Sequence, residues 1–255
     1  MEALRTRVIG EIKGNLSDAA LTARYDQLHS QSRPELLKNR VRVDRVIGLA
    51  NPGISLQVHL GKYHRSEIEP VVEAQRKIAG VEPDLFAPEP QNLHMAVFLL
   101  NPSYSHDMEA ASANQGIYTG PTIVKEEYYE RYKLAVRRVL IGLSPFQVRF
   151  TGILATPQAI FAYGLDSGIL NFLRLSLWKA LDNEGLPFAD RQPNIVHSTI
   201  LRYRRPLNNP RRFVRMIEKL RRQNLGAITI HRITMIREIR SYMAFTPLEE
   251  FELGV

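Results

Sequence analysis

The sequence predicts an α+β protein in which two similar parts each contribute a strand that carries a histidine. Segments typical of strands alternate with amphipathic segments typical of helices, a mixture that favours the α+β class. Two apolar strands, near residues 92–100 and 194–201, hold His94 and His197 in comparable places, which indicates an internal duplication. The 255 residues are 44% apolar and 24% charged, as expected of a globular protein.

The first part of the chain begins with a charged segment of about 50 residues that is expected to be helical. It ends at Asn51-Pro52-Gly53, because proline and glycine interrupt helices. Residues 54–60 alternate between apolar and polar side chains and predict a half-buried strand. A helix is expected over 66–79, and a proline-containing approach then leads to the strand at 92–100.

The second part follows the same order after residues 101–122, which are expected to form an irregular insertion rich in Pro, Ser, Asn and Gly. Apolar and aromatic residues recur at helical spacing from Val124 to about Ile141. Next come two expected strands, a helix closed by glycine and proline, and the second histidine strand, over 146–150, 159–164, 167–183 and 194–201. Pro210 begins a basic helix to about residue 223, and β-rich segments at 227–240 and 245–253 complete a sheet.

Composition excludes several classes of protein. The chain has no cysteine, which excludes disulfides, thiolate metal sites and cysteine nucleophiles. Its longest uncharged runs are far shorter than the ~20 apolar residues of a membrane span. The start, Met1-Glu2-Ala3-Leu4-Arg5, lacks an apolar signal core, so a cytoplasmic protein without a membrane partner is expected.

The positive charge of the chain is concentrated in one segment, residues 202–222, which we call the basic block. It contains nine basic residues and one acidic residue, a balance of +8 that equals the formal net charge of the whole chain, +8. Such a block is typical of a surface that binds a phosphate-rich partner. The alternative interpretation is a solvated helix face.

His94 and His197 are the histidines that suggest chemistry, because each lies in an otherwise apolar strand. A buried imidazole costs free energy unless it has a partner. Alternation along a strand places Ala96 beside His94 and Thr199 beside His197. The remaining histidines are expected to be ordinary surface or packed residues, namely His29, His59, His64, His106 and His231.

Both histidine strands resemble signatures of the two-histidine (2H) phosphoesterase superfamily, which includes bacterial RNA 2′,3′-cyclic phosphodiesterases, also called 2′-5′ RNA ligases. His197-Ser198-Thr199-Ile200-Leu201-Arg202 resembles the second signature, and Asn92-Leu93-His94-Met95-Ala96-Val97-Phe98-Leu99 resembles the first. Residues 145–152 and 185–188 are similar to the linker between the motifs. The resemblance covers roughly residues 53–253.

The resemblance implies a two-lobed fold with antiparallel sheets around a central groove, formed by residues 51–255 behind an N-terminal helical extension of residues 1–50. It implies a phosphoesterase that needs neither metal nor cofactor and acts on 2′,3′-cyclic phosphates of RNA or of a small nucleotide. Imidazole titrates near ~6.5, so one histidine can deprotonate the attacking oxygen while the other protonates the departing one.

The resemblance also assigns roles to individual residues. His94 is the expected acid, His197 the expected base, and the Thr199 hydroxyl is expected to bind phosphoryl oxygens. Ala96 occupies the place where the family has a second hydroxyl, which Ser103 or Ser105 could replace. The other expected substrate-binding residues are Tyr163, Arg202, Arg204 and Arg205. Arg202 would face away from His197 in a regular strand, so a structural ion pair is the alternative role for Arg202.

Two alternatives remain at this stage. Ala96 also permits a binding protein for RNA or nucleotides that kept the fold and lost turnover. A hydroxyl near His94 would favour the enzyme, and an apolar wall there would favour the binding protein.

A metal site is not expected, because His59 and His64 are five residues apart without a third ligand.

Overall fold

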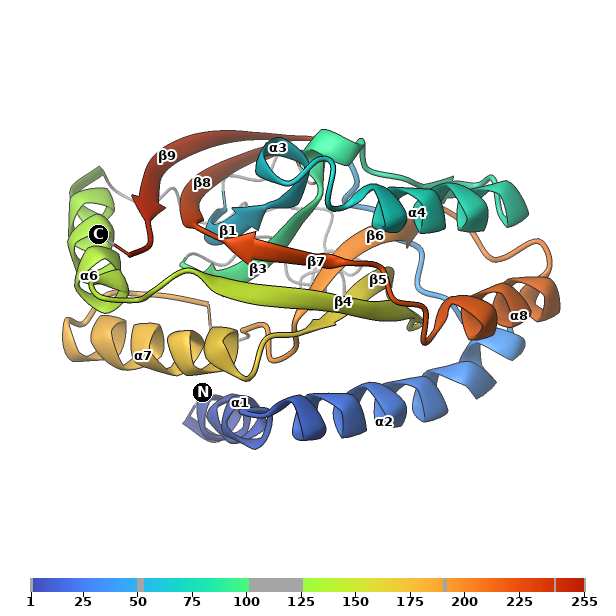
Figure 1. Cartoon of the computed structure of the whole chain (residues 1–255), viewed down its shortest axis with the longest axis horizontal. Coiled ribbons are helices and arrows are strands. Elements are labelled where there is room, and N and C mark those ends of the chain that lie inside the picture. The colour runs from blue at the N-terminus through green and yellow to red at the C-terminus, as the bar shows by residue number, and fades with distance from the viewer. Residues whose placement is uncertain (1, 50–52, 101–125, 190–191, 241, 255) are drawn as a thin grey trace, which may run out of the picture.

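The structure is a computed structural model that describes residues 2–49, 53–100, 126–189, 192–240 and 242–254. The insertion expected over 101–122, with His106, Ser103 and Ser105, lies outside these ranges. Within them, no helix has the length and apolar character needed to cross a membrane. Helices and antiparallel sheets mix along the chain, so the predicted α+β class is confirmed (Figure 1).

The first sheet has four antiparallel strands in the order β3-β1-β8-β9. Its members are β1 (Ile54–His59), β3 (His94–Leu99), β8 (Arg232–Arg240) and β9 (Ala244–Glu252). All six residues of β1 are buried, because neighbouring strands flank β1 on both sides and the core covers both of its faces. The alternating sequence pattern predicted a strand with one exposed side, and that prediction was wrong.

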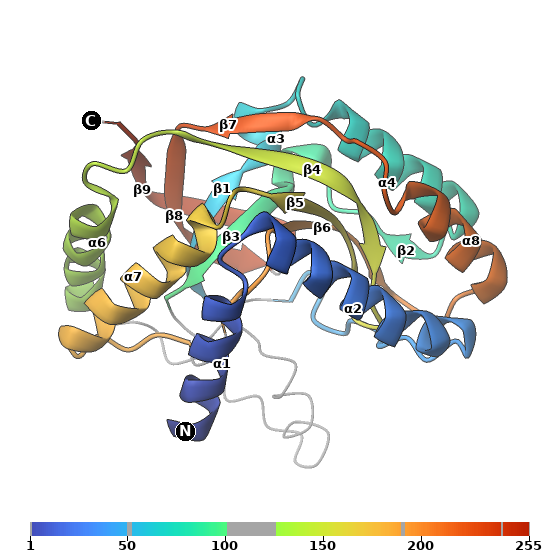
Figure 2. The same ribbon diagram turned by 60° about the horizontal axis from the view of Figure 1, so that its bottom comes forward.

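The second sheet has five antiparallel strands in the order β2-β6-β5-β4-β7. It is made of β2 (Leu85–Phe86), β4 (Phe146–Ala155), β5 (Ile160–Leu165), β6 (His197–Tyr203) and β7 (Ala227–Ile230). The histidine strands β3 and β6 belong to different sheets, and they contact each other where the two sheets meet (Figure 2). The fold therefore brings together the two motifs, which lie about 100 residues apart in the sequence.

The helices between paired strands are exchanged between the two halves. α4 (Glu69–Val81) follows β1 in the first half but packs against β6 of the second sheet. α7 (Ile169–Asn183) follows β5 in the second half but packs against β3 of the first sheet. Short helical segments α3 (Leu60–Tyr63) and η1 (Pro90–Asn92) flank β1 and β3, while α6 (Glu126–Leu140) packs beside α7.

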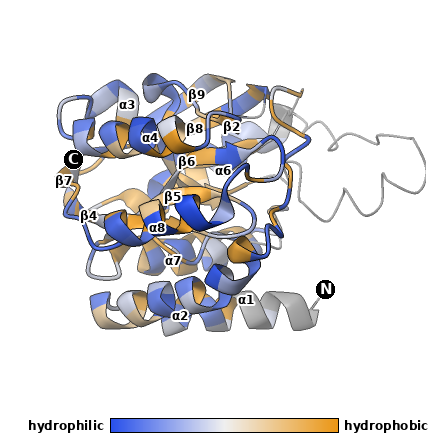
Figure 3. Cartoon of the chain, turned by 90° about the vertical axis from the view of Figure 1, so that its right-hand side faces the viewer, coloured by the Kyte–Doolittle hydropathy of each residue, from blue (hydrophilic) through white to orange (hydrophobic). Residues whose placement is uncertain are grey.

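The N-terminal helices α1 (Glu2–Gly14) and α2 (Asp18–Leu37) run along one side of the molecule (Figure 1). α1 contacts α7, and α2 contacts β4, β5 and α8 (Pro210–Leu220). Tyr25 of α2 anchors this contact, because its hydroxyl lies 2.8 Å from both the Gly164 and the Val196 carbonyl, which share its single proton. Figure 3 shows hydrophobic strands inside and hydrophilic residues on the helices.

Candidate active site

The two histidine strands present their side chains in the same way. Along β3 and along β6, the first, third and sixth residues are partly exposed, and the second, fourth and fifth are buried. His94 and His197 are the first residues, and Ala96 and Thr199 are the third. Each motif thus offers its histidine and the side chain two residues later on one accessible side.

A β-bulge at the fourth residue produces this pattern in both strands. In the β1–β3 ladder, Val97 is the extra residue between the Leu56–Phe98 and Gln57–Ala96 pairs. In the β5–β6 ladder, Ile200 is the extra residue between the Ile160–Leu201 and Phe161–Thr199 pairs. A bulge bends its strand and shifts the alternation of side chains by one residue.

Each bulge is held by a buried side chain from the exchanged helix. Arg174 of α7 donates from Nε to the Val97 carbonyl at 3.0 Å and from Nη2 to the Ala96 carbonyl at 2.9 Å. Gln75 of α4 donates to the Ile200 carbonyl at 2.8 Å. These bonds satisfy strand carbonyls that would otherwise be unpaired and buried.

His94 is oriented by a hydrogen bond to its own backbone segment. Its Nδ1 is 2.9 Å from the Asn92 carbonyl, which can only accept, so Nδ1 carries a proton and Nε2 is free for a substrate. His59 stands opposite His94 in the ladder with ring centroids 6.5 Å apart. Burial lowers the pKa of His94 and so does the Arg202 charge, while the Asn92 carbonyl raises it. Among the described residues, no hydroxyl is hydrogen-bonded to His94.

His197 faces more positive charge than His94 does. Burial lowers the pKa of His197 to about 4, and the positive charges of Arg174, Arg202 and His94 add to this effect. The Ile195 carbonyl raises the pKa, although the buried Nδ1 of His197 makes no hydrogen bond of normal geometry with a described residue. The Phe161 ring packs edge-on against the imidazole with centroids 5.0 Å apart. His197 is consequently neutral near pH 7.

Arg202 lies on the histidine side of β6, not on the opposite side as regular alternation predicted. The bulge at Ile200 shifts the phase of the strand, and the Arg202 charge acts on both histidines. Its guanidinium also pairs with Asp44 at 3.0 Å and covers the Tyr242 ring at 3.9 Å. Arg202 therefore makes the structural ion pair and faces the site at the same time.

Thr199 and Ala96 occupy equivalent positions with different chemistry. Both are partly exposed, and no described residue is hydrogen-bonded to the Thr199 hydroxyl, which leaves it available to a ligand. Tyr163 pairs with His197 across the β5–β6 ladder, but its hydroxyl donates to the Arg221 carbonyl and its ring lies 4.4 Å from that of Tyr25. The substrate role of Tyr163 stays a prediction.

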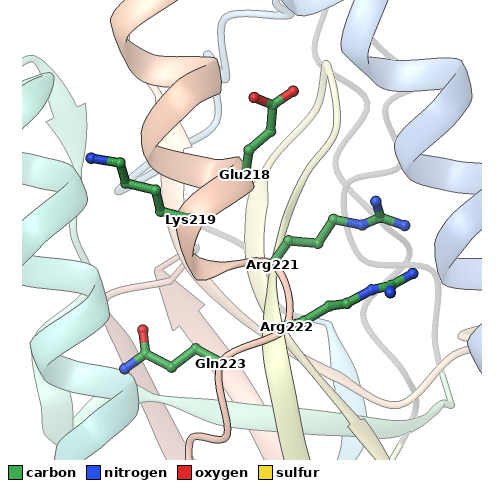
Figure 4. A pocket seen from close by; sticks show the side chains of 5 residues that line it. All are labelled: Glu218, Lys219, Arg221, Arg222 and Gln223. Carbon is green, nitrogen blue, oxygen red and sulfur yellow. The ribbon is translucent and has the colours of Figure 1, made fainter.

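The exposed arginines after β6 lie on the surface beyond the histidines. Arg204 covers the Phe86 ring at 5.1 Å, and Arg205 lies 3.6 Å from Asp84. A shallow cavity of about 690 Å³ lies at the end of α8, with no histidine in its wall (Figure 4). It is lined by Glu218, Lys219, Arg221, Arg222 and Gln223. The substrate roles of Arg204 and Arg205 also stay predictions.

Sequence reasoning missed Arg174 as a residue of this site, whereas His59, next to His94, is the packed histidine that was expected. His59 is only 2% exposed, and its pKa is lowered to about 3 by burial and by the charges of His94 and Lys62. His59 is next to His94 because it ends β1, the strand that pairs with β3. Within the described ranges, no three His, Asp or Glu side chains converge as metal ligands.

Comparisons with known proteins bear on the fold. No family model and no curated protein sequence matches the chain. The crystal structure of TT0787 of Thermus thermophilus matches with a TM-score of 0.55 and 18% identity, over 79% of this chain and 97% of TT0787. The crystal structure of a phosphoesterase matches with a TM-score of 0.50 and 14% identity, over 80% of this chain and 99% of that one. The chain thus has the fold of these two structures.

Proposed function

We propose that the protein is a phosphoesterase that hydrolyses 2′,3′-cyclic phosphates at the ends of RNA or on nucleotides. The single observation that carries this proposal is the repeated site geometry. Two strands from different sheets meet, and each presents a histidine through the same pattern of burial and the same bulge. Paired imidazoles on facing strands are suited to moving two protons at one phosphorus atom.

The electrostatics support a division of labour between the histidines. Because the buried Arg174 charge lowers the pKa of His197 and is not among the groups that act on His94, we assign the first proton shared by the pair to His94. His94 then holds the proton that an acid must give, and His197 is the free base. This agrees with the roles that the sequence resemblance implied.

The proposed reaction is the attack of water on the cyclic phosphate. His197 accepts a proton from the water as its oxygen bonds to phosphorus, and His94 gives its proton to the ribose oxygen that departs. The product is a phosphomonoester with an adjacent free hydroxyl. The Thr199 hydroxyl and the Arg202 guanidinium stabilise the charge on the phosphoryl oxygens, as donors placed before the reaction begins.

The test is an assay of the purified chain with the four 2′,3′-cyclic nucleotides and with oligonucleotides that end in a cyclic phosphate, in the presence of EDTA. Phosphorus NMR identifies the monoester product. We expect turnover by the natural chain and none by His94→Ala or His197→Ala. Turnover that persists in both variants, or that EDTA removes, contradicts the proposal.

Ala96 favours a second candidate, a binding protein without turnover. Ala96, which occupies the position equivalent to Thr199, offers no hydroxyl to a phosphoryl oxygen, and a lost hydrogen bond of this kind costs ~1–3 kcal/mol. Binding of a cyclic nucleotide by calorimetry, without product, would establish this candidate.

A further inference from the structure

We propose that Arg174 is a positioning residue of this site, which fixes the β3 bulge and supplies a buried positive charge that faces His197. The inference rests on the proposed function. It starts from a contrast between the two halves, since their equivalent bulges are held by side chains of different charge. A guanidinium holds the first and a neutral amide holds the second.

The geometry of Arg174 explains how it acts on His94 and Ala96. The side chain is 1% exposed, and its forked donors reach two consecutive carbonyls of β3, those of Ala96 and Val97. A third donor, Nη1, bonds Asn171 Oδ1 at 2.6 Å. Because a fork fixes two acceptors at once, Arg174 holds the bulge in one conformation and so orients the accessible side of β3.

The charge of Arg174 is not neutralised by direct contact. No carboxylate of the described residues lies within ion-pair distance of Arg174, and its hydrogen-bond acceptors are neutral carbonyl and amide oxygens. Burial lowers its pKa to about 10, and the Asp166 and Tyr25 charges oppose this, so Arg174 stays protonated near neutral pH. Its field therefore reaches His197, where burial comes first among the causes of the lowered pKa and the Arg174 charge second.

His197 faces further groups from the elements packed around it. Arg202 on its own strand and His94 on β3 are both positive when charged, and the Ile195 carbonyl is the opposing dipole. Arg202 is paired with Asp44, which offsets part of its field. Arg174 has no such partner, which makes it the group whose removal changes the charge near His197 most.

Four variants separate charge from shape. Arg174→Gln keeps a donor for the carbonyls and removes the charge, which copies the arrangement at Gln75. Arg174→Met removes the charge with a side chain of similar length, in case the first variant does not fold. Arg174→Lys keeps the charge and loses the fork. Gln75→Met loosens the other bulge and leaves all charges in place.

The measurements are the NMR titration of His197 and the pH dependence of kcat/KM. In Arg174→Gln or Arg174→Met we expect the His197 pKa to rise by roughly one pH unit. The pH at which kcat/KM rises on the acid side of its profile should shift upward by the same amount. The His197 pKa and the acid side of the pH profile should be unchanged in Arg174→Lys and Gln75→Met. In Arg174→Lys, kcat should still fall by roughly 10–100-fold, because without the fork β3 no longer holds His94 in position. An unchanged His197 pKa in folded Arg174→Gln or Arg174→Met overturns the proposal. The NMR titration does not depend on turnover. It therefore tests the effect of the Arg174 charge on His197 even if the natural chain fails to hydrolyse cyclic phosphates.

Discussion

His59 lies directly opposite His94 in the β1–β3 ladder and stacks on the Phe245 ring at a centroid distance of 4.4 Å. Both of its ring nitrogens are buried without a hydrogen-bond partner among the described residues. A buried polar atom without a partner costs ~1–3 kcal/mol. His59 therefore lowers the stability of the fold beside the histidine that we assign as the acid.

His59→Phe should stabilise the protein and largely preserve activity. Phenylalanine keeps the stack on Phe245 and removes the unpaired nitrogens, so we expect a gain of about 1 kcal/mol in the free energy of unfolding at pH 7.5. Urea denaturation and an assay of the cyclic-phosphate substrate check this. A loss of turnover as large as that of His94→Ala would show instead that His59 takes part in proton transfer.

Acid should destabilise the protein well above the pH at which carboxylates titrate. The pKa of His59 is lowered to about 3 and that of His197 to about 4, whereas both rise to about 6.5 on unfolding. The unfolded chain then binds more protons below pH 6.5, so stability is fully present above 6.5 and falls as the pH drops toward 4. Each histidine contributes at most about 1.4 kcal/mol per pH unit. Urea titrations at pH 7, 6 and 5 should show this slope, reduced in His59→Phe.

Replacing either of the two histidines that we propose as catalytic should lower turnover strongly. His94→Ala and His197→Ala should each lower kcat by roughly 10²–10⁴-fold, because each histidine handles one of the two protons. The double variant should be little worse than either single one, since the residues act as a unit. Thermal unfolding of all three checks that the fold persists. Additive losses in kcat would contradict a shared mechanism.

The pH profile of kcat/KM should be bell-shaped, with its maximum on the acid side of 6.5. His197 must be neutral and His94 protonated, and burial lowers the pKa of both. Activity therefore rises with pH as His197 loses its proton and falls again once His94 loses its own. A profile that stays flat to pH 9 would exclude His94 as the acid.

Ala96→Thr should restore the hydroxyl that the second motif has at Thr199. Ala96 is partly exposed on the histidine side of β3, so a larger side chain fits with a loss below about 1 kcal/mol, and turnover should rise several-fold. Ala162→Thr is the matched control, because Ala162 is 0% exposed and overpacking there costs ~1–3 kcal/mol. An equal loss of stability in both variants would show that position 96 is packed core.

Arg211→Glu/Arg212→Glu should weaken the binding of oligonucleotides but not of a cyclic mononucleotide. Both side chains are exposed at the start of α8, where phosphate contacts would release counterions. We expect the salt dependence of oligonucleotide binding to fall by about two phosphate contacts. Arg65→Glu/Lys179→Glu changes two exposed charges outside the basic block and is the control. If both pairs of substitutions act alike, the basic block has no special role.

The sequence was sufficient for most strands and helices and for the two strands that carry His94 and His197, because these depend on local periodicity and on recognisable motifs. It was insufficient for the bulges at Val97 and Ile200, since neither site has a glycine or proline to mark it. Because the bulge at Ile200 was not foreseen, Arg202 was wrongly predicted to lie on the side of β6 away from His197. Arg174 resembles any arginine of an amphipathic helix, and only the carbonyls of a distant strand explain its burial.

The exchange of α4 and α7 between the sheets has a consequence for how the molecule folds. Each histidine strand is held by a helix encoded in the other half, so a fragment cut within the 126–146 region would lose the clamp on its own histidine strand. Each histidine strand therefore needs a helix from the other half before its bulge is held. Folding then depends on contacts between distant parts of the chain, which slows it. The two histidines can reach their working arrangement only in a chain that has completed both halves.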